Sequence, residues 1–249
     1  MQNPTNTRLV LRKNPLRIVL FPKRMKKSEK KIIAEKNEFY RKLKPFQKCL
    51  FEHRVLVFIK NHQFIGKDLK VTREMELLIA ATAIMLTFGL DRYLYLSFDY
   101  ILIYPDIYYS QLSKEKHKGE ANPKYKVIVF SWKHFLEGFA DNSDNLNLGI
   151  HELTHGLHFS FLKYRNYTSK RFIAKYKELL NFLKNKEEQR KILDSKYIRN
   201  YAFENQYEFL SVLVEHFFET PHQFQQKLPE IYGYLCDMFN MDTRVVLDD

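Results

Sequence analysis

The sequence predicts an α+β fold in which a small mixed sheet is surrounded by helices. Residues 93–104 in the middle of the chain alternate in polarity and are rich in aromatic residues, which predicts a strand or hairpin, and residues 125–132 form a second strand-like run. The stretches on either side carry apolar residues at helical spacing. A hydrophobic content of 45% with only 7 Gly and 8 Pro indicates a globular chain with little room for flexible linkers.

Helical patterns occupy the first part of the chain. Residues 27–44 predict a lysine-rich, solvated helix, and residues 46–58 predict an apolar one. The strongest helix is expected over residues 72–90, because Thr72 stands at the N-cap position and glutamates follow it in the first turn. The apolar run at residues 77–90 is 14 residues long, which indicates a buried helix rather than a membrane span.

The expected strands come next, and helices resume after them. Residues 105–123, between the two strand-like runs, are polar and predict a loop. Strands confined to the middle of a helical chain support the α+β class. Four further helices are expected, over residues 145–162, 170–191, 205–219 and 228–240.

The chain of 249 residues shows no internal repeat. We expect residues 1–31 to form a basic N-terminal extension and residues 32–249 to form a single domain. The first 22 residues interrupt their apolar pieces with basic side chains and therefore predict no secretory signal. Two cysteines, Cys49 and Cys236, do not make a disulfide framework and predict a cytoplasmic location.

The net charge of +12, from 41 basic and 29 acidic residues, raises binding to nucleic acid or to an anionic membrane as a function. The densest basic cluster, residues 23–31, contains no aromatic residue, and we recognise no nucleic-acid-binding motif. We expect this cluster to be a solvated face that does not bind nucleic acid directly. Peripheral membrane contact of the basic N-terminus stays open as an alternative.

The most informative pattern is an HExxH array, His151-Glu152-Leu153-Thr154-His155. Residues four apart lie on one face of an α-helix, so both imidazoles can reach a single metal ion. Glu152 lies one step round the helix, where it can touch a water at the open position of the metal. The pattern therefore predicts a zinc site with its own general base.

A chance HExxH on a surface helix is the alternative, because the chain contains 9 His. The helix expected over residues 145–162 argues against chance, because it contains no proline and has an apolar flank. The residues of that flank are Leu148, Ile150, Leu153, Leu157, Phe161 and Leu162.

The third ligand decides the kind of zinc site, and two familiar arrangements fail. A histidine about ten residues after the start of the array would fall on Phe161, and a glutamate about twenty residues beyond its end would fall near Ala174. The next dense carboxylate region is residues 200–215. Within it, Glu208 and Glu215 are two helical turns apart and point the same way from one helix.

Three blocks of the sequence resemble the zinc-dependent peptidases of the Mlc titration factor A type, which regulate glucose uptake in bacteria. The blocks are the strand-like run ending in Ser-Trp at residues 126–132, the Asn-containing entry into HExxH at residues 147–155, and residues 201–221. Weaker similarity covers residues 39–109. The catalytic core of this family is similar to that of anthrax lethal factor, so the resemblance implies a zincin-like fold.

The resemblance implies a zinc metallopeptidase with one ion and aminopeptidase-like action on short peptides. His151, His155 and Glu208 would bind zinc, Glu152 would act as general base, and Tyr201 would stabilise the transition state. The chemistry of each role is sound, since zinc polarises a peptide carbonyl and a tyrosine hydroxyl can donate to the same oxygen. Peptides or proteins would be the substrates.

Each assignment has a structural alternative. Asn205-x-x-Glu208 is also a capping-box pattern, and Tyr201 is one of 16 tyrosines. Glu215 would accept a hydrogen bond from the N–H of a ligand imidazole, or it is simply a solvated helix residue. His158 stands where the family often has Asp, and we expect it to be a neighbour on the helix rather than a ligand.

The resemblance also implies a second kind of function. Some family members bind a transcriptional repressor of sugar uptake, so the alternative is a regulatory binding protein whose zinc site is weakly active or structural. Both functions keep HExxH, and Glu152, which a pure binding protein would not need, distinguishes them.

Overall fold

The computed structural model describes residues 19, 21–110, 114–141 and 143–247. Its main sheet has four strands in the order β1-β2-β6-β5. Three of these strands are parallel, and β5 pairs antiparallel to β6 at one edge. The strands are β1 (Gln63–Gly66), β2 (Tyr100–Tyr104), β5 (Gly119–Asn122) and β6 (Val127–Ser131). The prediction of a small mixed sheet is thereby confirmed.

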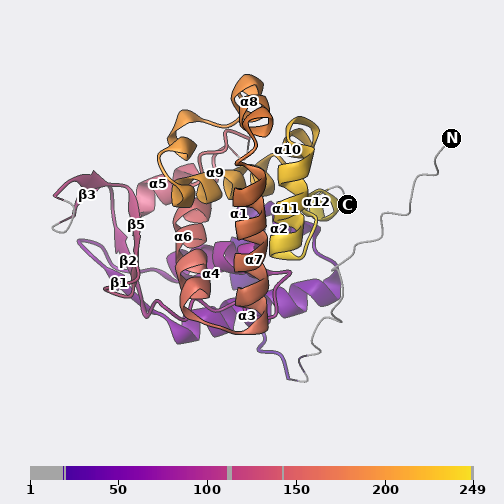
Figure 1. Cartoon of the computed structure of the whole chain (residues 1–249). Coiled ribbons are helices and arrows are strands. Elements are labelled where there is room, and N and C mark those ends of the chain that lie inside the picture. The colour runs from indigo at the N-terminus through magenta and orange to yellow at the C-terminus, as the bar shows by residue number, and fades with distance from the viewer. Residues whose placement is uncertain (1–18, 20, 111–113, 142, 248–249) are drawn as a thin grey trace.

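Helices make up most of the rest of the described chain. A two-stranded ribbon of β3 (Tyr108–Tyr109) and β4 (Lys116–His117) precedes β5. Figure 1 shows the strands gathered at one side of the molecule, with most helices on the other. The helices are α1 (Lys27–Lys36), α2 (Glu38–Lys42), α3 (Pro45–Asn61), α4 (Arg73–Thr87), α5 (Trp132–Glu137), α6 (Leu148–Lys163), α7 (Tyr167–Phe182), α8 (Lys186–Ser195), the 3₁₀ helix η1 (Asn200–Phe203), α9 (Gln206–Glu219), α10 (Pro221–Lys227), α11 (Pro229–Phe239) and α12 (Thr243–Leu247).

Two predicted helices are each divided in the structure. Within residues 27–44 the chain breaks at Asn37, whose side-chain oxygen accepts a hydrogen bond from the Tyr40 N–H and so starts α2. Within residues 170–191 the break precedes Asn185, which caps α8 by accepting from the Glu187 N–H. In both cases an internal asparagine competes successfully with continuation of the helix.

The prediction of a loop over residues 105–123 is wrong in part, because β3, β4 and β5 lie within it. These strands are short and polar, and pairing with their neighbours specifies them rather than their own hydrophobicity. The predicted strand at residues 93–104 is also too long, since only β2 at its end pairs. Most of the expected N-terminal extension, residues 1–31, lies outside the described residues, and its boundary falls within α1.

Helix α6 is the centre of the molecule. It packs against α4, α7, α9 and the strands β5 and β6. A Cβ atom at Gly156 would lie 2.7 Å from Ile128 Cδ1, so the absence of a side chain there brings α6 close to the sheet. Nearly all of its residues from 149 to 161 are buried. A helix in this position holds its side chains with little freedom.

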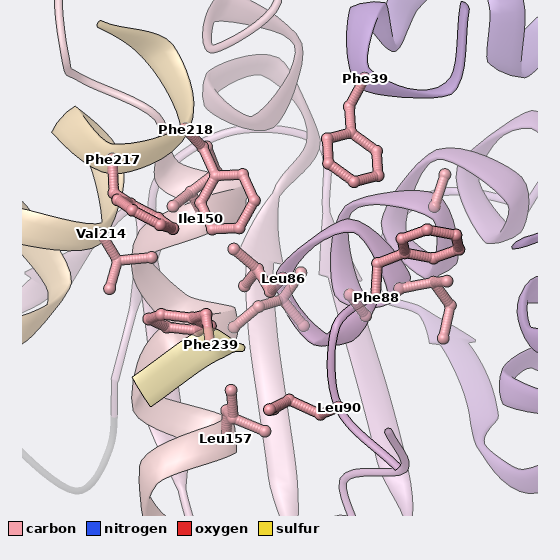
Figure 2. Close-up of a cluster of buried hydrophobic side chains, with 14 of the residues drawn as sticks. Phe39, Leu86, Phe88, Leu90, Ile150, Leu157, Val214, Phe217, Phe218 and Phe239 are labelled. Carbon is pink, nitrogen blue, oxygen red and sulfur yellow. The ribbon is translucent and has the colours of Figure 1, made fainter. Parts of the chain in front are cut away.

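Aromatic side chains from α9 and α11 pack in the core beside α6. Phe217 of α9 and Phe239 at the end of α11 stack at a centroid distance of 5.7 Å. Figure 2 shows them beside Ile150 of α6 and Leu86 of α4. This packing fixes α9 against α6, and the two helices carry the candidate site.

Helix α4 covers most of the apolar run at residues 77–90, and its side chains there are almost all buried. None of the helices in the described ranges is long and apolar enough to cross a membrane. Both cysteines are free; Cys49 on α3 is exposed, and Cys236 on α11 is partly covered.

Candidate metal centre

The two histidines of the HExxH array lie on α6, and a cap at its N-terminus fixes the start of that helix. The Asn147 side-chain oxygen accepts the Ile150 N–H at 3.0 Å. His151 and His155 then project one turn apart toward α9, with their Nε2 atoms 3.2 Å from each other. Both rings are buried, with 8% of each residue exposed.

Helix α9 supplies the carboxylate that faces these rings. Asn205 caps α9 by accepting the Tyr207 and Glu208 N–H groups at 2.8 and 3.1 Å. The carboxylate of Glu208 contacts the histidines: its Oε2 lies 2.8 Å from His151 Nε2, and its Oε1 lies 3.3 Å from His155 Nε2. Asn205 therefore caps the helix with its own side chain, and Glu208 is directed at the imidazoles.

His151, His155 and Glu208 form a group that can hold a metal ion. Their donor atoms all lie within 4.8 Å of one another. In a tetrahedral site with bonds of about 2.0–2.1 Å, two ligand atoms are separated by about 3.3 Å. The separations of 3.2 and 3.3 Å match that value, and the separation of 2.8 Å is slightly shorter. Two neutral imidazoles and one carboxylate thus fit a divalent cation in both chemistry and spacing.

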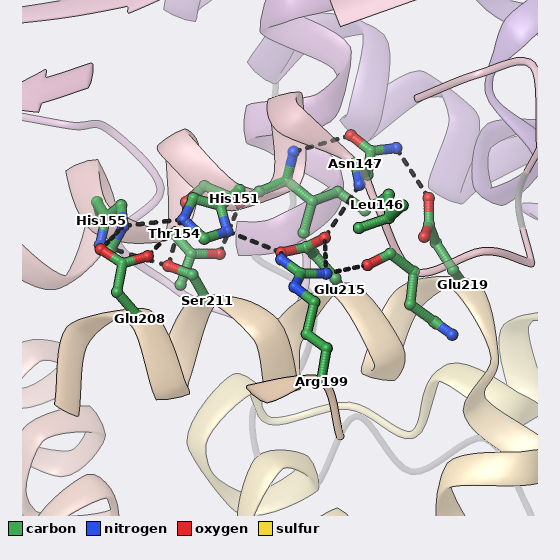
Figure 3. Close-up of polar contacts among 12 residues, drawn as sticks. Leu146, Asn147, His151, Thr154, His155, Arg199, Glu208, Ser211, Glu215 and Glu219 are labelled. Carbon is green, nitrogen blue, oxygen red and sulfur yellow. Dashed lines mark hydrogen bonds and ion pairs between the residues drawn. The ribbon is translucent and has the colours of Figure 1, made fainter. Parts of the chain in front are cut away.

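The second ring nitrogen of His151, Nδ1, contacts a buried carboxylate, as Figure 3 shows. His151 Nδ1 lies 2.7 Å from Oε1 of Glu215, a residue with only 1% of its surface exposed. This contact favours the tautomer with the proton on Nδ1, which leaves the Nε2 lone pair for a metal. On the other ring, His155 Nδ1 lies 3.4 Å from the Ser211 hydroxyl.

Glu215 has three further donors, and they link it to neighbouring segments. The Arg199 guanidinium donates to both of its oxygens, at 2.7 and 3.0 Å, and the Asn147 N–H donates to Oε2 at 3.0 Å. Arg199 also donates to the Asn145 carbonyl. A carboxylate with these partners is a fixed anion in the interior, because every contact satisfies its charge.

The carboxylates control the protonation of the site. Burial by itself would lower the pKa of His151, but Glu208 and Glu215 outweigh it and raise that pKa to about 10. Burial would raise the pKa of Glu208, yet His151 and His155 hold it well below its ordinary value. The site therefore favours positive charge: a proton on His151 supplies it when no metal is bound, and a divalent cation would displace that proton to reach a neutral imidazole.

Glu152 lies on the sheet side of α6. Only 7% of it is exposed, and a Cβ atom at Gly119 of β5 would lie 2.6 Å from its Cγ and 2.8 Å from its Oε1. Burial raises the pKa of Glu152, the two histidines oppose that rise, and Glu208 and Glu120 reinforce it. A carboxylate with a raised pKa is a stronger base and is better suited to accept a proton.

Tyr201 lies on η1 at the other side of His151. The two ring centroids are 5.9 Å apart, and 43% of the tyrosine is exposed. Burial of the hydroxyl region and the neighbouring Glu208 carboxylate raise the pKa of Tyr201, so it remains a neutral donor. The Arg199 guanidinium lies 5.8 Å from the centroid of the same ring.

His158 does not join the metal-binding group. Its ring faces Tyr176 and Tyr207 at centroid distances of 5.0 and 5.4 Å. Burial and then His155 lower the pKa of His158 to about 4, so it is a neutral neighbour on the helix.

Three contributors to the site were not predicted from the sequence. Arg199 is distant from the motif along the chain, and no local pattern links it to Glu215. Gly119 lies in the segment predicted as a loop, and Ser211 is an ordinary helix residue by sequence. Only the N-cap role of Asn147 carried a local signal, since it directly precedes an apolar helical run.

Comparison with known proteins agrees with these features. The model of the family described as glucose-regulated metallo-peptidase M90 matches residues 11–240. An uncharacterized protein from Synechocystis sp. is 26% identical over 228 residues, which cover 82% of this chain and 80% of the relative.

Proposed function

The chain belongs to the glucose-regulated metallopeptidase M90 family, and we propose that it is a zinc metallopeptidase that hydrolyses peptides with Glu152 as general base. The observation that carries this proposal is the joint placement of His151, His155 and Glu208 around one point, with Glu152 buried beside them. The match to the family covers most of the chain, including every residue of this group.

Zinc is the metal that suits the donor set. Two imidazole nitrogens and one carboxylate leave a fourth tetrahedral position open, which is the usual composition of catalytic zinc sites. The chemistry that bound zinc supplies is polarisation of the peptide carbonyl and acidification of water. Glu215 supports the site by holding His151 in the tautomer that a metal requires.

The residues of the chain then have distinct roles. Glu152 accepts a proton from the attacking water and delivers it to the leaving amine. Tyr201 donates a hydrogen bond to the carbonyl oxygen as negative charge develops on it. The edge strand β5, whose Gly119 lies against Glu152, offers backbone groups to an extended peptide. We assign the fold to the zincin-like class on this arrangement of sheet, helix and edge strand.

We further propose that the protein acts in the cytoplasm on short peptides, in the manner of an aminopeptidase. Two unpaired thiols suit a reducing compartment. The family resemblance supports exopeptidase action.

The test is hydrolysis of a mixed peptide library by the zinc-loaded protein, with Glu152→Gln run beside it. We expect the variant to keep its zinc content and thermal stability and to lose at least about 100-fold in kcat. Glu74→Gln on α4 is the matched control, because this glutamate is exposed and we expect full activity. Equal hydrolysis by Glu152→Gln and the unmodified protein would refute the mechanism, and zinc-loaded protein without activity would favour the repressor-binding alternative.

A further inference from the structure

Three segments that are far apart in the sequence meet beyond the last turn of α6. The hydroxyl of Tyr164, the residue after α6, donates to the Leu96 carbonyl at 3.0 Å. The Lys126 carbonyl, just before β6, accepts from the Asp99 and Tyr100 N–H groups at 2.9 and 3.1 Å. The segments in contact are residues 96–100, 124–126 and 162–165.

These segments lie toward the other end of α6 from the start of the HExxH array, because α6 and β6 run antiparallel. A Cβ atom at Gly149, near the start of α6, would lie 2.6 Å from the ring of Phe135, which follows β6. A Cβ atom at Gly156 would lie 2.7 Å from Ile128 Cδ1, near the start of β6. The residues before β6 are therefore level with the last turns of α6. With a rise of about 1.5 Å per residue, the end of α6 lies roughly 12 Å beyond His155 along the helix axis.

Four large apolar side chains are exposed on these segments. The exposed fractions are 50% for Leu96, 49% each for Tyr125 and Leu162, and 39% for Tyr100. Exposure of apolar surface to water costs about 25 cal/mol for each Å². Single exposed apolar residues are ordinary, but several that gather on one surface mark a binding site.

The same segments are strongly basic. They contain Lys124, Lys126, Lys163 and Arg165, all of them exposed, and a single acidic residue, Asp99. The Lys126 ammonium lies 2.9 Å from the Asp99 carboxylate. Four basic residues and one acidic residue leave a net charge of +3 on a small surface. We call the exposed side chains of the three segments the end patch.

We propose that the end patch binds anionic lipid headgroups and holds the protein on a membrane surface. The cations attract the negative surface, while the tyrosine rings and leucine side chains enter the boundary between headgroups and acyl chains. The proposed cytoplasmic location fits this partner, because the cytoplasmic leaflet of a membrane carries anionic lipids. His151, His155 and Glu208 are not part of the end patch, so the candidate metal centre remains accessible to a substrate.

Two other partners account for less of the end patch. A single-stranded nucleic acid would use the cations and stack its bases on the tyrosine rings, but Leu96 and Leu162 offer no ring for stacking. A second copy of the chain that docked through the same surface would bring two sets of like charges together. An anionic lipid surface satisfies the cations, the rings and the aliphatic side chains at once.

The test is co-sedimentation of the full chain with vesicles of phosphatidylcholine alone and of equal parts phosphatidylcholine and phosphatidylserine. We expect binding to the anionic vesicles only, and weaker binding as the salt concentration rises. Lys124→Gln, Lys163→Gln and Arg165→Gln together should lower the partition coefficient roughly 10- to 100-fold. Leu96→Ser with Leu162→Ser should lower it roughly 10-fold or more.

Matched controls remove the same kinds of side chain from α7, α8 and the turn between them. Figure 1 shows α8 at the opposite end of the molecule from the loop that joins α6 to α7. Leu193 on α8 is 59% exposed, so Leu193→Ser is the control for the leucine variant. The control for the charge variant combines Lys177→Gln, Lys184→Gln and Lys186→Gln, three exposed positions. Both controls should bind the anionic vesicles as the unmodified protein does.

Absence of binding to the anionic vesicles would overturn the proposal, and so would equal losses of binding in the controls and in the patch variants. Tighter binding of a single-stranded oligonucleotide than of the anionic vesicles would also overturn it and would assign the end patch to nucleic acid. Thermal unfolding shows whether each variant is folded. If the leucine variant unfolds, the charge variant decides, because all three of its substituted side chains are exposed. Zinc content and peptide hydrolysis without vesicles should be unchanged in the charge variant, which separates this inference from the proposed function.

Discussion

At the scale of single residues, the position of Glu152, the proposed general base, depends on the absence of a side chain at Gly119. The Glu152 side chain occupies the space that a Cβ at position 119 would need. Strand β5 is fixed by its pairing with β6, and Glu152 is fixed by burial, so neither can yield easily.

We therefore expect Gly119→Ala to displace Glu152 and lower kcat at least about 100-fold, with zinc binding retained. Activity and metal content measured on the same preparation test this expectation. Gly233→Ala on α11 is the control, because no atom lies within 4 Å of the added Cβ. Alanine there should raise the free energy of unfolding by about 0.5–1 kcal/mol. Full activity of Gly119→Ala would show that Glu152 is not held where we place it.

Arg199 is a second residue that should affect the metal centre, although it is not a proposed metal ligand. Its guanidinium binds both oxygens of Glu215, the carboxylate that orients His151. Removing it leaves a buried anion with fewer donors. We expect Arg199→Ala to weaken zinc affinity about 10- to 100-fold, and Arg199→Lys to recover only part of the loss, because an ammonium cannot donate in the same bidentate way. A competition assay with a metal-binding dye measures both. Unchanged zinc affinity in Arg199→Ala would show that Arg199 does not support zinc binding through Glu215.

At the scale of elements, the start of α6 connects three segments through Asn147. Its side chain caps α6 and also donates to the Gly138 carbonyl at 2.7 Å and to Glu219 at 2.9 Å. Asn147→Ala should lower the free energy of unfolding by about 2–3 kcal/mol, because the cap and two buried acceptors are affected together. Asn185→Ala at the exposed start of α8 removes a cap alone and should cost about 1 kcal/mol. Urea unfolding of both variants gives the comparison, and equal costs would contradict the connecting role.

The same scale shows what the sequence could predict. The helices that became α3, α4, α6, α9 and α11 carry strong periodic patterns and were predicted with nearly correct bounds. The polar strand β5 was missed because only its partner β6 defines it. The group of His151, His155 and Glu208 was expected through family resemblance, since the spacing between α6 and α9 along the chain carries no geometric information. The family itself is confirmed, whereas similarity to anthrax lethal factor remains a prediction.

At the scale of the whole molecule, buried titratable groups limit the pH range of stability. Burial is the largest effect on His158 and His216 and lowers each pKa to about 4, from an ordinary value near 6.5. The folded state thus disfavours the protonated forms. No cost arises above pH 6.5, and stability falls as the pH drops from about 6.5 to 4, by up to roughly 3 kcal/mol for each group.

Glu219 has the opposite dependence. Burial raises its pKa to about 8 from an ordinary value of 4.5, so the folded state disfavours the charged carboxylate. Stability should fall as the pH rises from about 4.5 to 8. Unfolding free energies measured from pH 4 to 9 should show losses on both sides. Glu219→Gln should reduce the alkaline loss and leave the part that comes from the raised pKa of His151, and an unreduced loss would show that Glu219 does not contribute to it.

The two free thiols differ in exposure, so their reaction rates can report local unfolding around α11. Cys49 on α3 is exposed, whereas burial raises the pKa of the Cys236 thiol to about 12. A maleimide reagent at neutral pH should therefore modify Cys49 rapidly and Cys236 only when α11 separates from its neighbours. Fluorophores can accordingly be attached at one defined position without engineering. The rate of the slower reaction at Cys236 then measures how often the helical core is transiently exposed in the native protein.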